Sequence, residues 1–182
     1  MKNKLAMFDM DGTLFDTRTV NYCAYRKALQ TVGCELDYDW FLKNCYGRNY
    51  RDFLPPLTEE IETVHELKKK LYGEFLPEAV ENTHLFSILE GLRGQYYTAL
   101  VTTASRKNTL ELLRCFGRES CFDRLVTQEN VRKNKPDPEA YLYTMGLFGV
   151  KAADCIIFED SATGIAAAEA SGANLYVVKG FA

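Results

Sequence analysis

Apolar and polar positions follow two different periods along this 182-residue chain. Beyond residue 84, short apolar runs typical of buried strands alternate with segments in which apolar residues recur every three or four positions, as on one face of a helix. These runs, together with one near the amino terminus, predict strands at 5–9, 96–101, 124–127, 155–158 and 175–178. The longer segments predict helices at 85–92, 107–116, 138–148 and 162–170. Strands and helices that alternate at this interval favour parallel βαβ units with right-handed crossovers, and hence a doubly wound, Rossmann-like α/β sheet.

The block at 17–81 interrupts this alternation. Apolar residues at helical spacing predict successive helices there, among them one at 19–31, one that Asp37 caps, and one that begins at Thr58 as its cap and continues to about Phe75. No strand is expected between them, so the block is predicted to be a small helical subdomain inserted into the α/β fold. The core would then comprise 1–16 and 82–182.

Composition and charge restrict the class of protein. Hydrophobic residues make up 47% of the chain, which is enough to bury a substantial core. A net charge of −3 without a basic stripe argues against nucleic-acid binding. No apolar segment approaches the roughly 20 residues of a membrane span, and the amino terminus lacks the features of a signal peptide. We therefore expect a cytoplasmic, globular protein without a membrane or nucleic-acid partner, and find no motif that specifies an oligomeric state.

Two carboxylates stand where the first predicted strand ends. Asp9 and Asp11 follow the apolar run at 5–8 and precede Gly12 and Thr13. Burying unpaired carboxylates costs several kcal/mol or more, so a cation is expected beside them. Mg²⁺ is the best candidate, because it binds carboxylate oxygens together with substrate phosphates. The alternative is a simple strand-ending turn, since Asp-Gly is a common turn dipeptide.

Polar side chains also follow the later strands. Thr102 and Thr103 come directly after the second strand, Lys135 lies in the loop after the third, and Glu159 and Asp160 come directly after the fourth. Each has an ordinary structural explanation, as a strand-favouring threonine, a solvated lysine, or an acidic pair near a helix amino terminus. Ligands of open α/β sheets, however, bind outside the carboxyl ends of the strands, where all these groups would meet. Together they predict a site for phosphate and Mg²⁺.

These segments resemble, in order, the four motifs of the haloacid dehalogenase superfamily of phosphohydrolases. The resemblance lies in Asp9-x-Asp11-Gly12-Thr13, in Thr102 after a hydrophobic strand, in Lys135 before Pro136, and in Glu159-Asp160-Ser161 with Gly164 downstream. The insert at 17–81 resembles the small helical cap of that family, the C1 type. The resemblance implies a Mg²⁺-dependent phosphatase that hydrolyses a small phosphorylated metabolite.

The resemblance assigns chemical roles to the first motif. Asp9 is the expected nucleophile, which forms an aspartyl-phosphate. Asp11 is the expected acid and base, which protonates the leaving oxygen and then activates the hydrolytic water. Gly12 would permit the backbone turn that separates these two roles, and Thr13 would orient Asp11.

The other motifs are expected to hold phosphate and metal. Thr102 would donate a hydrogen bond to a phosphoryl oxygen, and Lys135 would tie the nucleophile to the phosphate as a point charge. The expected metal ligands are Asp9, Asp11 through its backbone carbonyl, Asp160, and Glu159 either directly or through water.

Further substrate contacts are expected outside these motifs. The resemblance gives the residue after Thr102 a contact with phosphate. Relatives often carry Asn or Ser at that position, whereas this chain has Thr103, so the sequence leaves this contact open. In the insert, Arg48, Asn49 and Arg51 occupy the place of the family's substrate-facing loop. A solvated turn explains the same residues equally well.

Two other functions stay open on the sequence. A sugar phosphomutase like β-phosphoglucomutase would use the same core but return the phosphoryl group to the sugar. A phospho-acceptor signalling domain also combines Asp, Thr, Lys and Mg²⁺ in a doubly wound sheet, although its acceptor lies deeper in the chain and no helical insert follows its first strand. Asp11 argues against dehalogenating and phosphonate-cleaving relatives, which lack the second aspartate.

Overall fold

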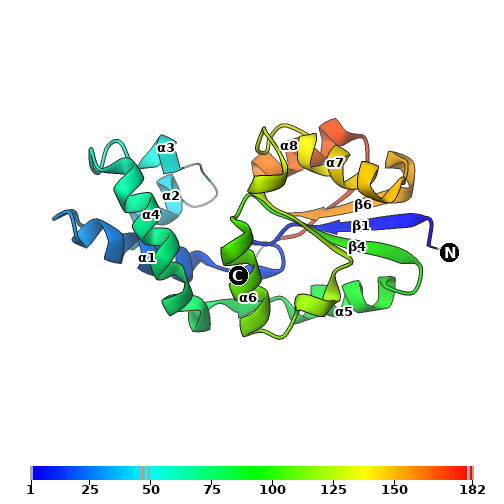
Figure 1. Cartoon of the computed structure of the whole chain (residues 1–182), viewed down its shortest axis with the longest axis horizontal. Coiled ribbons are helices and arrows are strands. Elements are labelled where there is room, and N and C mark those ends of the chain that lie inside the picture. Colours follow the sequence, from blue (N-terminus) through cyan, green and yellow to red (C-terminus); the bar gives the residue numbers. More distant parts are fainter. Residues whose placement is uncertain (1, 46–47, 49, 180, 182) are drawn as a thin grey trace. The chain divides into compact units, whose positions relative to one another are not determined.

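The computed structural model describes residues 2–45, 48, 50–179 and 181 of the chain. The chain forms two compact units. The core unit comprises Met1–Asp16 with Val80–Ala182, and the helical unit comprises Thr17–Ala79. Figure 1 shows the helices and strands of both units.

Five parallel strands form the sheet of the core unit, in the order β5-β4-β1-β6-β7. They are β1 (Lys4–Phe8), β4 (Tyr96–Val101), β5 (Arg124–Val126), β6 (Cys155–Glu159) and β7 (Asn174–Val177). Because β1 is central and the strands are parallel, its carboxyl end lies between those of β4 and β6. The doubly wound α/β fold predicted from the sequence is confirmed.

Helices cover both faces of this sheet. Figure 1 shows α7 (Glu139–Phe148) and α8 (Ala162–Ser171) on one face, and α5 (Thr83–Leu92) and α6 (Arg106–Cys115) on the other. Right-handed crossovers explain this division, because the strand order proceeds outward from β1 in opposite directions. Short 3₁₀ helices lie in the connections, at Glu119–Cys121, Gln128–Asn130 and Ala152–Asp154. None of the described helices combines the length and apolar character that a membrane span requires.

The helical unit consists of short helices around an apolar core. They are α1 (Arg18–Gln30), α2 (Tyr38–Asn44), α3 (Tyr50–Phe53), α4 (Ile61–Leu71) and the 3₁₀ helix η1 (Tyr72–Glu78). Leu29, Phe41 and Val64 are buried where the apolar faces of these helices meet. Asp37 caps α2 as predicted, because its carboxylate accepts a hydrogen bond from Trp40 N at 2.8 Å.

The last predicted helix of the insert differs from the structure. It was expected to begin at Thr58, but α4 begins at Ile61, and the Thr58 hydroxyl instead accepts a hydrogen bond from Glu60 N at 3.1 Å. This bond closes a turn ahead of the helix, because a threonine hydroxyl can satisfy an amide two residues further on. Directly after α4, the chain continues as the 3₁₀ helix η1, which contains Pro77. Because α4 ends at Leu71, the helix predicted to continue to about Phe75 is divided between α4 and η1.

A short antiparallel pair, not predicted from the sequence, lies where the chain leaves and re-enters the core unit. It joins β2 (Phe15–Asp16) to β3 (Val80–Glu81). The core unit therefore includes Val80 and Glu81, for which the sequence predicts a place in the insert. Arg118 holds β3 through two hydrogen bonds to the Glu81 carboxylate, at 2.5 and 2.9 Å. Strands of two residues are too short for periodicity to reveal.

Two stacked rings hold neighbouring strands in register beside the carboxyl edge. Phe8 of β1 and Phe158 of β6 are buried and paired, with ring centroids 4.5 Å apart and ring planes 1° apart. The backbone N–H of Asp9 donates to the carbonyl oxygen of Phe158 at 3.0 Å. The residues that follow the rings, Asp9 and Glu159, are therefore held level with one another on adjacent strands.

Replacing Phe158 by Leu should lower the free energy of unfolding by about 1 to 2 kcal/mol, because Phe8 loses its stacking partner. Urea unfolding followed by circular dichroism measures this change. The control is Tyr143→Leu, at a side chain on α7 that is 41% exposed, which should change the free energy of unfolding by less than about 0.5 kcal/mol. Equal losses in the two variants would contradict a packing role for the stacked pair.

Candidate active site

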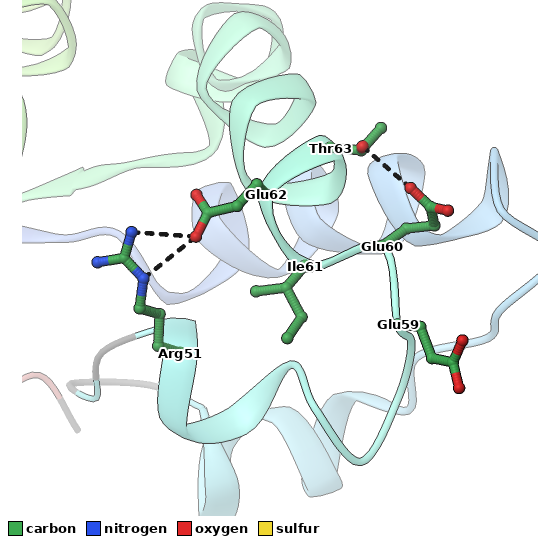
Figure 2. A pocket seen from close by; sticks show the side chains of 6 residues that line it. All are labelled: Arg51, Glu59, Glu60, Ile61, Glu62 and Thr63. Carbon is green, nitrogen blue, oxygen red and sulfur yellow. Dashed lines mark hydrogen bonds and ion pairs between the residues drawn. The ribbon is translucent and has the colours of Figure 1, made fainter.

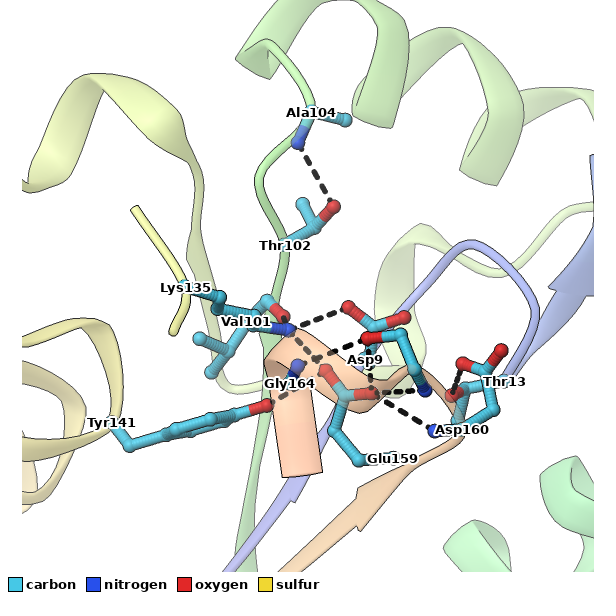
Figure 3. A network of polar contacts seen from close by, with 11 residues as sticks. Asp9, Thr13, Val101, Thr102, Ala104, Lys135, Tyr141, Glu159, Asp160 and Gly164 are labelled. Carbon is cyan, nitrogen blue, oxygen red and sulfur yellow. Dashed lines mark hydrogen bonds and ion pairs between the residues drawn. The ribbon is translucent and has the colours of Figure 1, made fainter. Parts of the chain in front are cut away.

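The ammonium group of Lys135 lies at the centre of a polar cluster at the carboxyl edge of the sheet (Figure 3). Its Nζ donates to Asp9 Oδ1 at 2.7 Å, to Glu159 Oε1 at 2.6 Å and to the carbonyl oxygen of Val101 at 3.1 Å. The side chain is only 4% exposed. An ammonium group has three N–H donors, so each donor has an acceptor and the orientation of the group is fixed. The acceptors come from the ends of β1, β6 and β4, and the loop before α7 supplies the lysine.

The buried carboxylate of Glu159 accepts five hydrogen bonds. Oε1 accepts from Lys135 Nζ and, at 3.1 Å, from the Tyr141 hydroxyl. Oε2 accepts from the backbone N–H groups of Asp160 and Ser161, at 2.9 and 3.0 Å, and from the Ser161 hydroxyl at 3.1 Å. A carboxylate offers about four lone-pair sites, so these bonds engage the whole group. Glu159 therefore joins Lys135 to the amino-terminal end of α8.

Asp160 lies against the turn that follows β1. Its Oδ1 accepts a hydrogen bond from the Thr13 hydroxyl at 2.7 Å. Gly12 has a φ of 90°, and a Cβ at this position would overlap Asp160 Oδ2. The Thr13 hydroxyl donates its bond to Asp160 because the turn folds back toward the end of β6, and its expected role in orienting Asp11 stays a prediction. Gly12 thus permits both the turn and the close approach of Asp160.

Burial and mutual repulsion shift the pKa values in this cluster. Burial, followed by repulsion from Glu159, raises the pKa of the Asp9 carboxyl well above its usual value, although Lys135 opposes the change. Burial lowers the pKa of Lys135, but the attraction of Asp9 and the other acidic groups outweighs it and holds that pKa well above its usual value. Burial raises the pKa of Asp160 to about 6. Lys135 is therefore charged, whereas the two aspartates hold protons unusually well when no cation is bound.

The chemistry of these side chains fits a divalent cation. One carboxylate oxygen each from Asp9, Glu159 and Asp160 lie within 4.8 Å of one another. Because these three carboxylates are accompanied by one ammonium group, which contacts Asp9 and Glu159, the ionised cluster has an excess of negative charge that a divalent cation would balance. Oxygen donors of this kind suit Mg²⁺. Asp11, half-buried after β1, is not one of these three carboxylates, and its expected donor is the backbone carbonyl.

Thr102 follows β4 directly and is 5% exposed. Its Oγ1 accepts a hydrogen bond from Ala104 N at 3.0 Å, which leaves the hydroxyl hydrogen available for donation. The residue before it, Val101, is the one whose carbonyl binds Lys135. Thr103 is exposed. A phosphoryl group at this edge would therefore find a hydroxyl donor next to the ammonium group.

The arginines predicted to bind substrate belong to the helical unit. Nε and Nη2 of Arg51 both donate to Glu62 Oε1, at 3.1 and 3.0 Å, so its charge is paired within the unit. Figure 2 shows the pocket beside this pair, which two further glutamates also line. Arg48 is exposed, and Asn49 lies outside the described residues. Substrate binding by Arg48 and Arg51 stays a prediction.

Sequence reasoning missed the contribution of Tyr141. This residue lies on the buried face of α7, and its hydroxyl donates to Glu159. The apolar pattern shows only that the position faces the core, so the available signal was chemical, because a buried phenol needs a hydrogen-bond partner. Gly164 was recognised only as part of a motif. Its role is spatial, since a Cβ there would overlap the Glu159 carboxylate.

Known proteins are similar to this chain in sequence and in fold. A family model described as haloacid dehalogenase-like hydrolase matches residues 6–178. The phosphorylated carbohydrates phosphatase of Thermotoga maritima is 33% identical over 177 residues, which cover 91% of this chain and 80% of that protein. The fructose-1-phosphate phosphatase YqaB of Escherichia coli is 28% identical, over 91% of each chain. The crystal structure of CbbY from Rhodobacter sphaeroides in complex with phosphate has a TM-score of 0.86 at 22% identity, over 100% of this chain and 88% of that one.

The match extends over nearly the whole chain and includes all four motifs. The resemblance inferred from those motifs is confirmed, and the signalling-domain alternative is set aside. The chain is an enzyme of the haloacid dehalogenase-like hydrolase family.

Proposed function

We propose that this chain is a Mg²⁺-dependent phosphatase that hydrolyses phosphorylated carbohydrates through an aspartyl-phosphate at Asp9. The observation that carries the proposal is the buried Lys135 ammonium, which binds Asp9 and Glu159 beside Asp160. Two relatives are named as phosphatases of phosphorylated carbohydrates and of fructose 1-phosphate, which favours sugar phosphates as the substrate class. The expected partner is therefore a small phosphorylated metabolite, and the expected location is the cytoplasm.

Asp9 would act as the nucleophile, since Lys135 fixes one of its oxygens and thereby orients the carboxylate. In the first step an Asp9 oxygen forms a bond to phosphorus, the bond from phosphorus to the ester oxygen breaks, and Asp11 gives that oxygen a proton. In the second step Asp11 takes a proton from water, whose oxygen attacks phosphorus and releases inorganic phosphate from Asp9. One water is consumed, and both carboxyl groups return to their starting state.

Positioned positive charge would supply most of the acceleration. Acid and base catalysis contributes about 10²- to 10⁴-fold. Hydrolysis of phosphate monoesters needs accelerations of up to about 10²¹-fold. Lys135 provides one charge, and Thr102 provides a hydroxyl donor for a phosphoryl oxygen. Asp9 and Asp160, with the Asp11 carbonyl, would hold Mg²⁺, which when bound neutralises negative charge on the transferring phosphoryl group.

Asp9→Asn should lower phosphate release from p-nitrophenyl phosphate by at least about 10³-fold, because an amide is a poor nucleophile. The matched control is Asp154→Asn, at an exposed aspartate of the same unit, which should keep full activity. Activity of Asp9→Asn within tenfold of the unchanged enzyme would contradict the proposed mechanism.

With sugar phosphates, phosphate release should equal substrate consumption, whereas an isomeric sugar phosphate formed without phosphate release would favour the phosphomutase.

Mg²⁺ should raise the melting temperature more at about pH 7.5 than at about pH 5. Burial raises the pKa of Asp160 to about 6, so the folded protein binds this proton more tightly than the unfolded chain does. The stability that the group contributes without metal is therefore full below about pH 4 and is lost as the pH rises through about 6. Because Mg²⁺ needs the ionised carboxylate, its stabilising effect grows over the same range.

Melting curves with and without millimolar MgCl₂ measure this effect, and Asp160→Asn should abolish it. A Mg²⁺-induced shift of equal size at both pH values would contradict a metal site at Asp160.

Gly12→Ala should raise the Mg²⁺ concentration needed for half-maximal activity by at least about tenfold, because the added Cβ displaces Asp160. Gly149→Ala is a matched control. Gly149 also has a positive φ, of 63°, but a Cβ there would meet nothing within 4 Å. It should therefore cost about 1 kcal/mol of stability without changing the Mg²⁺ requirement. If both variants needed the same Mg²⁺ concentration for half-maximal activity, the displacement of Asp160 would not be the cause. The positive φ that the two glycines share would then explain any change.

A further inference from the structure

Tyr141 contacts both charged groups at the centre of the cluster. It is the third residue of α7 and is fully buried. Its hydroxyl donates to Glu159 Oε1 at 3.1 Å, and Lys135 Nζ lies 5.1 Å from the centroid of its ring. An aromatic face attracts a cation at this distance. As Figure 3 shows, one side chain thus interacts with the anion and with the cation that the anion binds.

The two oxygens of Glu159 are held by different elements. Oε2 accepts its hydrogen bonds at the start of α8, from Asp160 and Ser161. Oε1 accepts from Lys135 and Tyr141. The backbone of α8 packs directly against the carboxylate, since a Cβ on Gly164 would overlap it. Without the Tyr141 hydroxyl, Lys135 is the remaining donor to Oε1 among the residues that the structure describes.

The position of Lys135 Nζ depends on a balance among its acceptors. One nitrogen donates to Asp9, to Glu159 and to the Val101 carbonyl at the same time. A Glu159 oxygen that has lost its second donor attracts the ammonium more strongly, since charge-assisted hydrogen bonds are the strong ones. A shift of Nζ toward Glu159 lengthens its bond to Asp9, and Asp9 then loses its fixed orientation.

We propose that Tyr141 is a positioning residue for the reaction. By donating a hydrogen bond to Glu159, it maintains the hydrogen bond from Lys135 Nζ to Asp9. This inference rests on the phosphatase function proposed above. It assigns Tyr141 no contact with substrate or metal, so its effect should fall on the chemical step rather than on substrate binding.

Tyr141→Phe keeps the ring and removes only the hydroxyl. We expect kcat for p-nitrophenyl phosphate to fall about tenfold and KM to change by less than about twofold, because a misplaced group slows the chemical step. The control is Tyr143→Phe, which removes a hydroxyl from an exposed tyrosine of the same helix and should leave both constants unchanged. Circular dichroism and urea unfolding establish that the variants are folded.

A double-mutant cycle separates positioning from a general structural role. If Tyr141 acts through Glu159, Tyr141→Phe should lower kcat by less than about twofold in a Glu159→Gln background. A repeated tenfold fall in that background, an unchanged kcat in the single variant, or a Tyr141→Phe protein that does not fold would each overturn the proposal. Because Asp9→Asn tests the phosphatase itself, an active enzyme whose kcat is insensitive to Tyr141→Phe refutes this inference alone.

Discussion

A single buried ammonium group holds together the carboxyl edge of the core sheet. Removing an ammonium from water costs several kcal/mol, and losing one partner of a buried ion pair typically costs about 3 to 5 kcal/mol. Lys135 meets this cost with acceptors from three strand ends, at Asp9, Val101 and Glu159. Because β1 lies between β4 and β6, one nitrogen can reach all of them. The ion pair therefore cross-links the strands that carry the proposed catalytic groups.

The same cluster contains more negative than positive charge. Glu159 is engaged by five hydrogen bonds, so the imbalance falls on Asp9 and Asp160, whose pKa values are raised. Carboxylates crowded in this way are costly to the folded protein, and perturbed pKa values of this kind are common at functional sites. A divalent cation relieves the repulsion. The feature that destabilises the metal-free cluster is thus the one that suits it to hold a divalent cation.

The helical unit uses its charges differently. The pair of Lys27 and Glu74 is close, at 2.6 Å, but its side chains are 50% and 52% exposed. The pair of Arg51 and Glu62 is more exposed still. Exposed pairs contribute little to stability, so this unit depends on apolar packing around residues such as Phe41. Its polar surface can therefore change at little cost to the fold, and the substrate contacts predicted for Arg48 and Arg51 lie on this surface.

The sequence by itself determined the order of strands and helices, because the period of apolar positions depends only on neighbours along the chain. It also identified the polar residues that follow the strands, from Asp9 to Asp160, because parallel strands bring their ends to one edge. Only the tertiary structure decided that Thr13 binds Asp160, which lies 147 positions away, and that Tyr141 binds Glu159. It also decided that β3 belongs to the core unit, through a pairing too short to leave a periodic signal. Such contacts depend on which segments meet in space and on fractions of an ångström between side chains, and no local pattern records either.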